Sequence, residues 1–460
     1  MRWWAVLVRF LTVVVVAPSS APAQQVERLI AAAEALGART GVMALDADGR
    51  VLWRHRAAEV FVPASNQKVL TAAALLSGLG PGYTFTTRFL LEGGRLVVRA
   101  SGDPNWISGT AHDSGVLFAA VAAALRERGI GSVTGVELRP GTFLGPSRPA
   151  SWPQDQLQTY YCAPTGPFVL EQGTFQVRLQ PGDGEYARAE LVAPAAGLPL
   201  RGKVTLVARG KRAVYGAQDD GDGVLLRGTF PQRGNPVTIR TAVVEPAAWY
   251  EAALGKALRD AGIAIGAAPA AGDQVVYEHA SELRLALERM LADSSNFDAE
   301  QCLRVLGDRR ADGSLAGGLA ALRQELAVLV GALPAEVVFA DGSGLSKQNR
   351  VTPALLVLAL LRADAGPGGE LLRACLPVAG RNGTLADRFR GTDLVGRVAA
   401  KTGWIRGASA LSGFVTGRDQ RRRAFSILMN YDPKADGKNQ ELKKLQEEIV
   451  AAIDQLEPQR

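Results

Sequence analysis

The stretch Pro63-Ala-Ser-Asn-Gln-Lys-Val-Leu-Thr-Ala-Ala-Ala-Leu-Leu76 decides how the rest of the sequence is interpreted. It predicts an Ala/Leu-rich helix, because proline and serine are favoured where a helix begins. Ser65 and Lys68 are three residues apart, a spacing that places a hydroxyl and an amine on one helical face. A lysine whose pKa is lowered by burial or by a neighbouring cation can take the serine proton and make the hydroxyl a nucleophile. Alone, however, Ser-x-x-Lys is common by chance, and a solvated lysine near a capping serine is its more frequent meaning.

Two further short motifs carry polar side chains. Asp293-Ser-Ser-Asn296 lies between two expected helices, and Ser294 and Asn296 are spaced so that both can point into one cleft. Considered alone, this segment fits an ordinary helix cap better. Lys401-Thr-Gly403 ends a mostly apolar run and is expected on a strand, whose open edge could receive an extended peptide that ends in a carboxylate. The alternative is an ordinary strand start with an exposed lysine.

Composition limits the classes of protein to which these motifs can belong. The chain has 460 residues, of which 47% are apolar and 21% charged, values typical of a globular protein of two or three domains. Its three cysteines are widely spaced, which excludes a disulfide-rich scaffold and a Cys-x-x-Cys metal or redox site. With three histidines and no His-Glu-x-x-His motif, we expect neither a metal nor another cofactor. A net charge of +7 permits contact with anionic surfaces without requiring it, and we expect no nucleic-acid partner.

The N-terminus predicts an export signal over residues 1–23. Two arginines in the first nine residues precede a short apolar run, and Ala21-Pro-Ala23 provides a cleavage pattern. The apolar run is too short for a bilayer span, which needs about 20 residues. We therefore expect an exported, periplasmic or otherwise extracytoplasmic protein with at most peripheral membrane contact, a retained membrane anchor being the alternative. Removal of the segment would lower the formal charge from +7 to +5.

Three regions that differ in their predicted secondary structure follow the signal. A helical pattern and a β-hairpin on Asp48-Gly49 precede the Ser65 helix. From about residue 86 to 245, short β-like runs alternate with Gly, Pro and Asp turns, which predicts a mostly β insertion of two small domains. Helical patterns then return, and the end of the chain supplies two strands and a last amphipathic helix. We expect residues 24–85 and 246–460 to form one α+β domain that residues 86–245 interrupt.

The order of the three motifs resembles that of penicillin-binding proteins and serine β-lactamases. Further stretches resemble the D-Ala-D-Ala carboxypeptidase/endopeptidase family of peptidase S13, which are low-molecular-mass, class C penicillin-binding proteins: Ser101-Gly-Asp-Pro104, Asp341-Gly-Ser-Gly-Leu-Ser346, Pro377-Val-Ala-Gly-Arg-Asn-Gly-Thr-Leu385 and Ala410-Leu-Ser-Gly-Phe-Val. The resemblance covers nearly the whole chain after the signal, including the large insertion. It implies an α/β (α+β) transpeptidase-like fold, in which helices and an all-helical subdomain flank an antiparallel sheet and the mostly β insertion interrupts the domain.

The resemblance also implies a role for each residue of the first two motifs. Ser65 would be the nucleophile that the penultimate D-Ala carbonyl, or a β-lactam, acylates, and Lys68 would be the base in that step. Ser294 would relay a proton to the leaving group. Asn296 would hydrogen-bond the substrate amide and hold the lysine in place. The middle residue of this motif is usually Asp in the family, and we expect little effect from Ser295 because that position points away from the chemistry.

The strand motif is implied to bind the end of the substrate. Lys401 would supply positive potential for the terminal carboxylate and help to keep the base neutral, while Thr402 would donate a hydrogen bond. Gly403 would leave the backbone edge unobstructed, and the backbone N–H groups of the nucleophile and of Trp404 would form the oxyanion hole. Trp404 replaces a small or hydroxylated residue often found there, so we expect a narrower cleft beside it.

These features predict a serine-type D-Ala-D-Ala carboxypeptidase whose action could extend to DD-endopeptidase cleavage. Its expected partners are peptidoglycan stem peptides and β-lactams, and the sequence predicts no oligomeric state. One alternative, a serine β-lactamase, is disfavoured because no Glu-bearing loop motif is evident and Ser294 is not replaced by Tyr. The other alternative, an inactive peptidoglycan-binding scaffold, is disfavoured because all five polar side chains of the motifs are present: Ser65, Lys68, Ser294, Asn296 and Lys401. The segment 136–143 lacks an acidic pair common in the family, which puts in doubt substrate contacts from the insertion.

Overall fold

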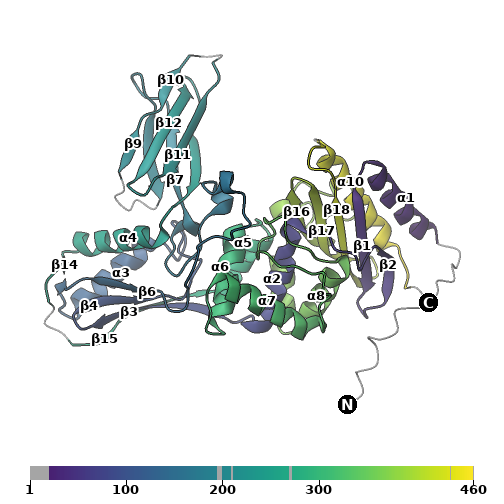
Figure 1. Ribbon diagram of the computed structural model, residues 1–460, viewed down its shortest axis with the longest axis horizontal. Helices are drawn as coiled ribbons and strands as arrows, with labels where there is room; N and C mark the ends of the chain where they lie inside the picture. The colour runs from purple at the N-terminus through teal and green to yellow at the C-terminus, as the bar shows by residue number, and fades with distance from the viewer. Residues whose placement is uncertain (1–19, 194–198, 209–210, 269–271, 436, 459–460) are drawn as a thin grey trace.

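A computed structural model describes residues 20–193, 199–208, 211–268, 272–435 and 437–458 (Figure 1). Residues 1–19 of the predicted signal peptide lie outside the described residues. The first helix, α1, spans Ala21–Ala35, so the predicted cleavage pattern lies in its first turn, where proline is favoured. Among the described residues, no helix combines the length and the apolar character that crossing a membrane requires.

The central layer is a five-stranded antiparallel sheet of order β16-β17-β18-β1-β2. Its strands are β1 (Arg39–Asp46), β2 (Val51–His55), β16 (Val398–Ile405), β17 (Ala408–Thr416) and β18 (Arg422–Asn430). The predicted hairpin on Asp48-Gly49 and the two predicted C-terminal strands are confirmed. β17 and β18 are buried along almost their whole length, because α1 and α10 (Lys438–Asp454) cover one face of the sheet and α8 (Pro353–Ala365) covers the other.

A helical subdomain adjoins this sheet and surrounds α2 (Gln67–Gly78) (Figure 1). Its other helices are α5 (Leu283–Leu291), α6 (Asn296–Asp308), α7 (Leu315–Val330) and α9 (Gly369–Cys375). α2 contacts α6, α7 and α8, and every one of its residues from Gln67 to Leu76 is buried. The small side chains of its alanines let the neighbouring helices approach closely. The helix predicted at the Ser65 motif is confirmed, although it begins at Gln67, after a 3-10 turn over Ala64–Asn66.

A second sheet, of order β15-β3-β4-β6, lies beside the helical subdomain (Figure 1). Its strands are β3 (Thr84–Glu92), β4 (Arg95–Arg99), β6 (Val136–Arg139) and β15 (Gln274–Glu282). α3 (Ser114–Glu127) and α4 (Pro246–Asp260) pack on it through a cluster that includes Phe118 and Tyr250. The sequence pattern places residues 246–282 in the first domain, whereas α4 and β15 pack here. We therefore propose that the inserted region ends at Glu282, where the chain enters α5.

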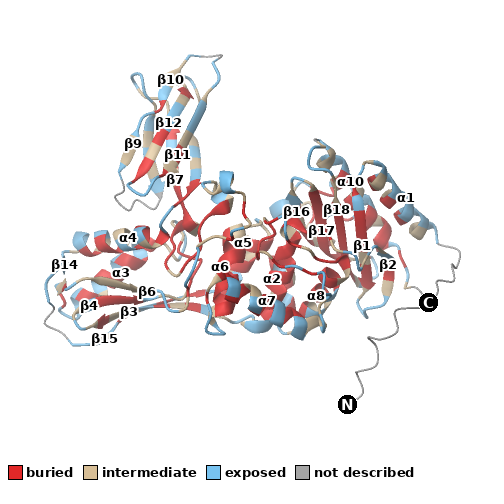
Figure 2. Cartoon of the chain, in the orientation of Figure 1, coloured by how far each residue is buried: buried red, intermediate tan, exposed pale blue. Residues whose placement is uncertain are grey.

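A β-sandwich projects from this region (Figure 1), with one sheet of order β13-β7-β8 and another of order β10-β12-β11 to which β9 is paired. The strands are β7 (Thr174–Gln180), β8 (Arg188–Ala193), β9 (Leu200–Gly202), β10 (Thr205–Val207), β11 (Val214–Asp219), β12 (Val224–Pro231) and β13 (Val237–Ala242); β5 (Ser132–Val133) and β14 (Ala264–Ile265) form a separate short pair. The predicted β character of the insertion is confirmed. Figure 2 shows buried residues concentrated in the helical subdomain and the central sheet, whereas the sandwich is largely exposed or intermediate.

Candidate active site

Ser65 lies in the 3-10 turn that leads into α2, and Lys68 lies in the first turn of that helix. The Nζ atom of Lys68 is 3.1 Å from the Ser65 hydroxyl oxygen, so the predicted pair is in hydrogen-bond contact. Ala64, just before the serine, has a φ of 47°, a left-handed conformation that is costly for a residue with a Cβ atom. Its carbonyl oxygen approaches Gly344 so closely that a Cβ atom added there would lie 1.8 Å away. Packing against the Gly344 loop therefore fixes the backbone of the serine turn.

Lys68 is completely buried beneath the serine. Its Nζ atom donates to Asn296 Oδ1 and to the carbonyl oxygen of Ser343, each at 2.7 Å. A neutral amine keeps two hydrogens, which match these two acceptors, and its lone pair is left for the serine hydroxyl. Burial lowers the pKa of Lys68 to about 7, although the charges of Asp341 and Glu300 favour the protonated form. The arrangement can therefore hold a neutral amine beside the serine near neutral pH.

Two buried carboxyl groups lie beside Lys68, and the sequence patterns assign a role to neither of them. Glu300 accepts from the backbone N–H groups of Gly342 and Ser343, at 3.0 and 2.7 Å, and so fixes the carbonyl group that Lys68 contacts. Burial raises the pKa of Glu300 to about 8, and the charge of Asp341 adds to the shift. Asp341 begins the Asp-Gly-Ser-Gly stretch, whose glycines signal a turn, but Glu300 lies in a helical pattern that does not distinguish it from a surface residue.

Strand β16 carries the third motif at the edge of the central sheet. Lys401 is fully buried, and its Nζ atom donates to the carbonyl oxygen of Thr402 at 2.8 Å. Burial lowers the pKa of Lys401 well below its ordinary value, and the charge of Lys68 adds to the shift. The carbonyl oxygen of Lys401 accepts from Asn66 Nδ2 at 3.0 Å, which ties the strand to the serine turn. A Cβ atom at Gly403 would lie 2.9 Å from Asn66 Nδ2, so the strand can approach this closely only with glycine there.

The loop before α6 combines a helix cap with two cleft-lining residues. Ser295 caps α6 by accepting from the backbone N–H of Asp298 at 3.2 Å, so the cap interpretation of this segment is also correct. Ser294, whose φ is 63°, and Asn296 lie on either side of the cap residue and line the cleft. Asn296 also joins the site to the inserted region, because its Nδ2 atom donates to the carbonyl oxygen of Tyr161 at 2.9 Å.

A cleft of about 1230 Å³ brings these segments together. The catalytic wall is the part formed by the first domain, with Ser65, Ser294, Asn296 and Trp404 in the lining and Lys68 and Lys401 buried behind them. The insertion wall is the part formed by the inserted region, with Tyr160, Tyr161, Gln172 and Arg240 in the lining. The insertion therefore reaches the cleft, although through residues other than the segment 136–143 that the sequence singles out.

Trp404, at the end of β16, lies in the cleft lining, the position it must have if it is to narrow the cleft as expected. Its side chain is 57% exposed, and Nε1 donates to the hydroxyl oxygen of Tyr431 at 3.3 Å. The hydroxyl of Thr402 donates to the hydroxyl of Thr384 at 2.8 Å. The three motifs thus surround one cleft. Lys68 joins two of them directly, because its Nζ atom contacts both Ser65 and Asn296.

Metal ligands are not gathered in the part of the chain that the structure describes: no group of three or more His, Cys, Asp or Glu side chains there is placed to hold an ion. The cysteines Cys162, Cys302 and Cys375 are free and buried. Burial raises the pKa of the Cys302 thiol well above its ordinary value, so this thiol stays neutral and unreactive.

Known proteins are similar to this chain over most of its length. The model of the D-Ala-D-Ala carboxypeptidase 3 (S13) family matches residues 22–452. A D-alanyl-D-alanine carboxypeptidase of Actinomadura sp. (strain R39) is 33% identical over 428 residues, which cover 86% of this chain and 78% of that protein. The D-alanyl-D-alanine carboxypeptidase DacB of Haemophilus influenzae is 26% identical over 424 residues, which cover 86% of each chain.

Solved structures share the fold. The crystal structure of penicillin binding protein 4 (dacB) from Haemophilus influenzae has a TM-score of 0.77 at 25% identity and covers 93% of this chain and 98% of that one. A structure of the same protein in complex with a β-lactam has a TM-score of 0.72 at 24% identity and covers 92% and 98%. The predicted fold class, a penicillin-binding-protein-like α/β domain with a large insertion, is confirmed.

Proposed function

Because the chain belongs to the D-Ala-D-Ala carboxypeptidase 3 (S13) family, we propose that Ser65 is the acylated nucleophile of its serine-type D-Ala-D-Ala carboxypeptidase activity. The family and the enzyme class predicted from the motifs are confirmed. The observation that carries the assignment of Ser65 is its contact with Lys68, an amine whose pKa burial lowers to about 7.

Acylation begins with proton transfer from the Ser65 hydroxyl to the neutral amine of Lys68, 3.1 Å away. The serine oxygen attacks the penultimate D-Ala carbonyl carbon, and an ester forms as the bond to the terminal D-Ala nitrogen breaks. Ser294 passes the proton from the lysine to the leaving amine. The backbone N–H groups of Ser65 and Trp404 stabilise the oxyanion, an effect worth about 3 kcal/mol for each such donor. Water then hydrolyses the ester, with Lys68 again taking a proton.

The terminal carboxylate of the substrate is assigned to the β16 side of the cleft, beside Lys401 and Thr402. A carboxylate there favours the charged form of Lys401, and a charged Lys401 opposes protonation of Lys68 because the two buried amines interact. Substrate binding therefore favours the neutral base that the first step needs. The open edge near Gly403 takes the peptide backbone by strand addition.

A labelled penicillin tests the assignment of Ser65. We expect the label on the peptide that contains Ser65, measured as a mass increase of that peptide, and no label in the Ser65→Ala variant. An intact Ser65 that stays unmodified after exposure overturns the assignment. Sustained steady-state turnover of nitrocefin would instead favour a β-lactamase.

For the natural substrate we propose peptidoglycan stem peptides, cut outside the cytoplasm by carboxypeptidase and DD-endopeptidase action. Two observations support this: the sequence predicts an export signal, and the cleft extends from the serine to the inserted region, which leaves room for more than a dipeptide. Digestion of purified peptidoglycan separates the two activities, because a carboxypeptidase releases D-Ala whereas an endopeptidase opens cross-links. Peptidoglycan left unchanged by enzyme that hydrolyses soluble D-Ala-D-Ala peptides would contradict the proposal.

A further inference from the structure

The lining of the cleft carries more positive charge than hydrolysis of a D-Ala-D-Ala bond explains. Besides one acidic residue, Asp293, its charged members are Arg240, Arg289, Lys347 and Arg406. Arg289 is neutralised, because it forms an ion pair with Asp298 at 2.6 Å. The insertion wall contributes Arg240, and the way in which this side chain is held points to a ligand.

Arg240, on β13, is fixed by neutral groups. Its Nε atom donates to Thr174 Oγ1 at 2.9 Å, and Nη2 donates to Gln172 Oε1 at 2.6 Å. The guanidinium carbon lies 5.7 Å from the centroid of the Tyr160 ring. Among the ion pairs between described residues, none includes Arg240. The side chain is therefore oriented at the cleft while its charge has no carboxylate partner within the described residues.

The two carboxylates that act on Arg240 from a distance are already engaged by other groups. They belong to Asp298 and Glu171. Asp298 is bound by Arg289, as described above, and Glu171 accepts from both the backbone N–H and the hydroxyl of Ser108, each at 2.6 Å. Neither carboxylate can turn towards Arg240 without leaving these donors, so the charge of Arg240 remains available to a ligand in the cleft.

A short chain of contacts joins Arg240 to the catalytic wall. Gln172, which accepts from Arg240, donates from Nε2 to Ser295 Oγ at 3.3 Å. Ser295 stands between the two cleft-lining residues Ser294 and Asn296. Arg240 therefore lies on the insertion wall of the same cleft, and a single side chain, that of Gln172, connects it to the loop before α6. A substrate that extends from the serine towards the insertion would pass this guanidinium.

We propose that Arg240 binds a carboxylate carried by the acyl part of the substrate, one or two residues upstream of the D-Ala-D-Ala dipeptide. The inference rests on the proposed function, which assigns the terminal carboxylate to Lys401 and leaves Arg240 for a second anion. Thr174 and Gln172 use two of the five guanidinium N–H groups, and both hydrogens of Nη1 and one of Nη2 remain. Neighbouring hydrogens on these two nitrogens suit a two-point contact with a carboxylate. The substrate class is therefore an acidic peptide, in preference to its amidated counterpart.

The test compares two pairs of peptides that end in D-Ala-D-Ala. The members of a pair differ only in one residue, glutamate against glutamine, placed directly before the dipeptide in the first pair and one residue further upstream in the second. For the wild-type chain we expect kcat/KM to be about tenfold higher for the glutamate peptide in at least one pair, because charge-assisted hydrogen bonds are the strong ones. The preference should decrease as the ionic strength is raised.

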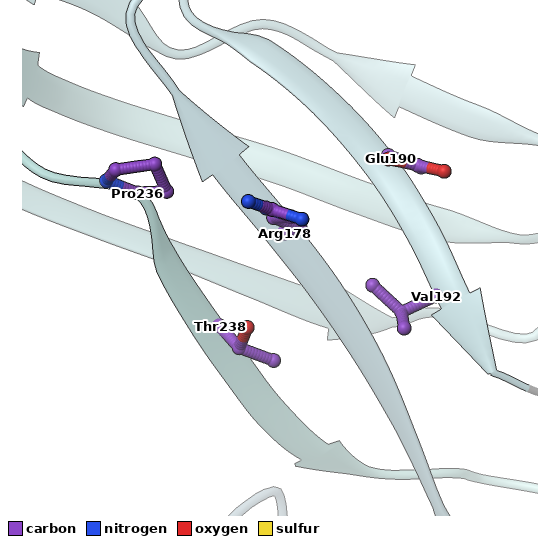
Figure 3. A pocket seen from close by; sticks show the side chains of 5 residues that line it. All are labelled: Arg178, Glu190, Val192, Pro236 and Thr238. Carbon is purple, nitrogen blue, oxygen red and sulfur yellow. The ribbon is translucent and has the colours of Figure 1, made fainter. Parts of the chain in front are cut away.

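Substitutions identify the residue that causes the preference. The Arg240→Gln variant is expected to hydrolyse both members of that pair with equal kcat/KM. The Arg240→Lys variant keeps the positive charge but cannot form two parallel hydrogen bonds to a carboxylate, so it should retain part of the preference. Arg178, on the neighbouring strand β7, offers a matched control. It lies in a separate hollow of about 320 Å³ with Glu190 and Val192 (Figure 3) and outside the cleft lining. Arg178→Gln removes the same charge from the same sheet and should keep the full preference.

Equal rates on both members of both pairs, a preference that survives in Arg240→Gln, or a preference that is lost in Arg178→Gln would each overturn the inference. A failure of the proposed function looks different, because then no peptide is hydrolysed and Ser65 takes up no penicillin. Equilibrium binding of the same peptides to the Ser65→Ala variant measures the carboxylate preference without turnover. The inference is therefore tested in either case.

Discussion

The two walls of the cleft are built in opposite ways. On the catalytic wall, Lys68 and Lys401 are fully buried. Lys68 is hydrogen-bonded to groups from two distant segments of the chain, and Lys401 to the carbonyl oxygen of the adjacent Thr402. On the insertion wall, Tyr160 is 53% exposed and Arg240 is also exposed. Burial lowers the pKa of Lys68 to about 7, so this amine can exchange a proton near neutral pH. Partial burial of its guanidinium lowers the pKa of Arg240, but a guanidinium remains charged near neutral pH and acts by attracting anions rather than by exchanging a proton.

This contrast indicates a division of labour between chemistry and selection. If the buried amines act in the chemical step, as we propose, a change at either of them should slow all substrates together. A change at an exposed side chain alters a contact that only some substrates make, so the ratio between substrates should move. The following substitutions and measurements challenge that division, from the largest expected effect to the smallest.

Lys68→Ala should have the largest effect, because it removes the group that we propose accepts the Ser65 proton. We expect the rate constant for acylation by labelled penicillin to fall about 10³-fold, within the range that a general base contributes. Lys68→Arg should be similarly slow, since a guanidinium keeps its proton. Lys256→Ala is the matched control: this exposed lysine of α4 pairs with Asp260, and its loss should leave the rate within about twofold. Rapid acylation of a folded Lys68→Ala variant would show that another group is the base.

The pH dependence of acylation should be the next largest effect. Burial lowers the pKa of Lys68 to about 7, so the reactive neutral amine is lost as the pH falls below that value. The acylation rate constant of the wild-type chain should fall about tenfold per pH unit below 7 and level off above it. Stopped-flow measurement between pH 5 and 9 checks this, with protein fluorescence as a control for unfolding. A rate that rises towards acid pH would exclude Lys68 as the base.

Trp152→Phe probes the link between the inserted region and the site. Trp152 is buried, and its Nε1 atom donates to Asp341 Oδ2 at 3.0 Å, next to the loop that contacts Lys68. Removing this donor should lower the free energy of unfolding by about 1–3 kcal/mol, measured by denaturant titration. Trp53→Phe is the control, because the buried Nε1 of Trp53 has no hydrogen-bond partner among the described residues. Equal losses in the two variants would mean that the bond to Asp341 contributes nothing of its own.

The sequence predicts features that depend on neighbouring residues and misses those that depend on distant ones. The helix at Ser65 and Lys68 follows from local spacing and from residues that favour a helix start, and the structure has it. The contact of Glu300 with the backbone beside Ser343 requires α6 and a loop some forty residues later to meet, which no local pattern encodes. The case of α4 is similar. Its apolar spacing predicts a helix, but not that the apolar face covers the sheet of the insertion.

Trp404 should have the smallest effect and gives the sharpest test, because it belongs to the catalytic wall and is nevertheless exposed. If exposure decides the role of a side chain, Trp404→Thr should change selection and spare the chemistry, since the backbone N–H remains. We expect acylation by a penicillin with a small side chain to stay within about twofold, and acylation by a bulky one to rise about fivefold as space opens beside the serine. Tyr431→Phe, which removes only the hydroxyl that Trp404 contacts, should leave this ratio unchanged. Equal slowing of acylation by both penicillins in Trp404→Thr would instead assign the indole to the chemical step. The role of a side chain would then depend on which wall of the cleft it belongs to and not on its exposure.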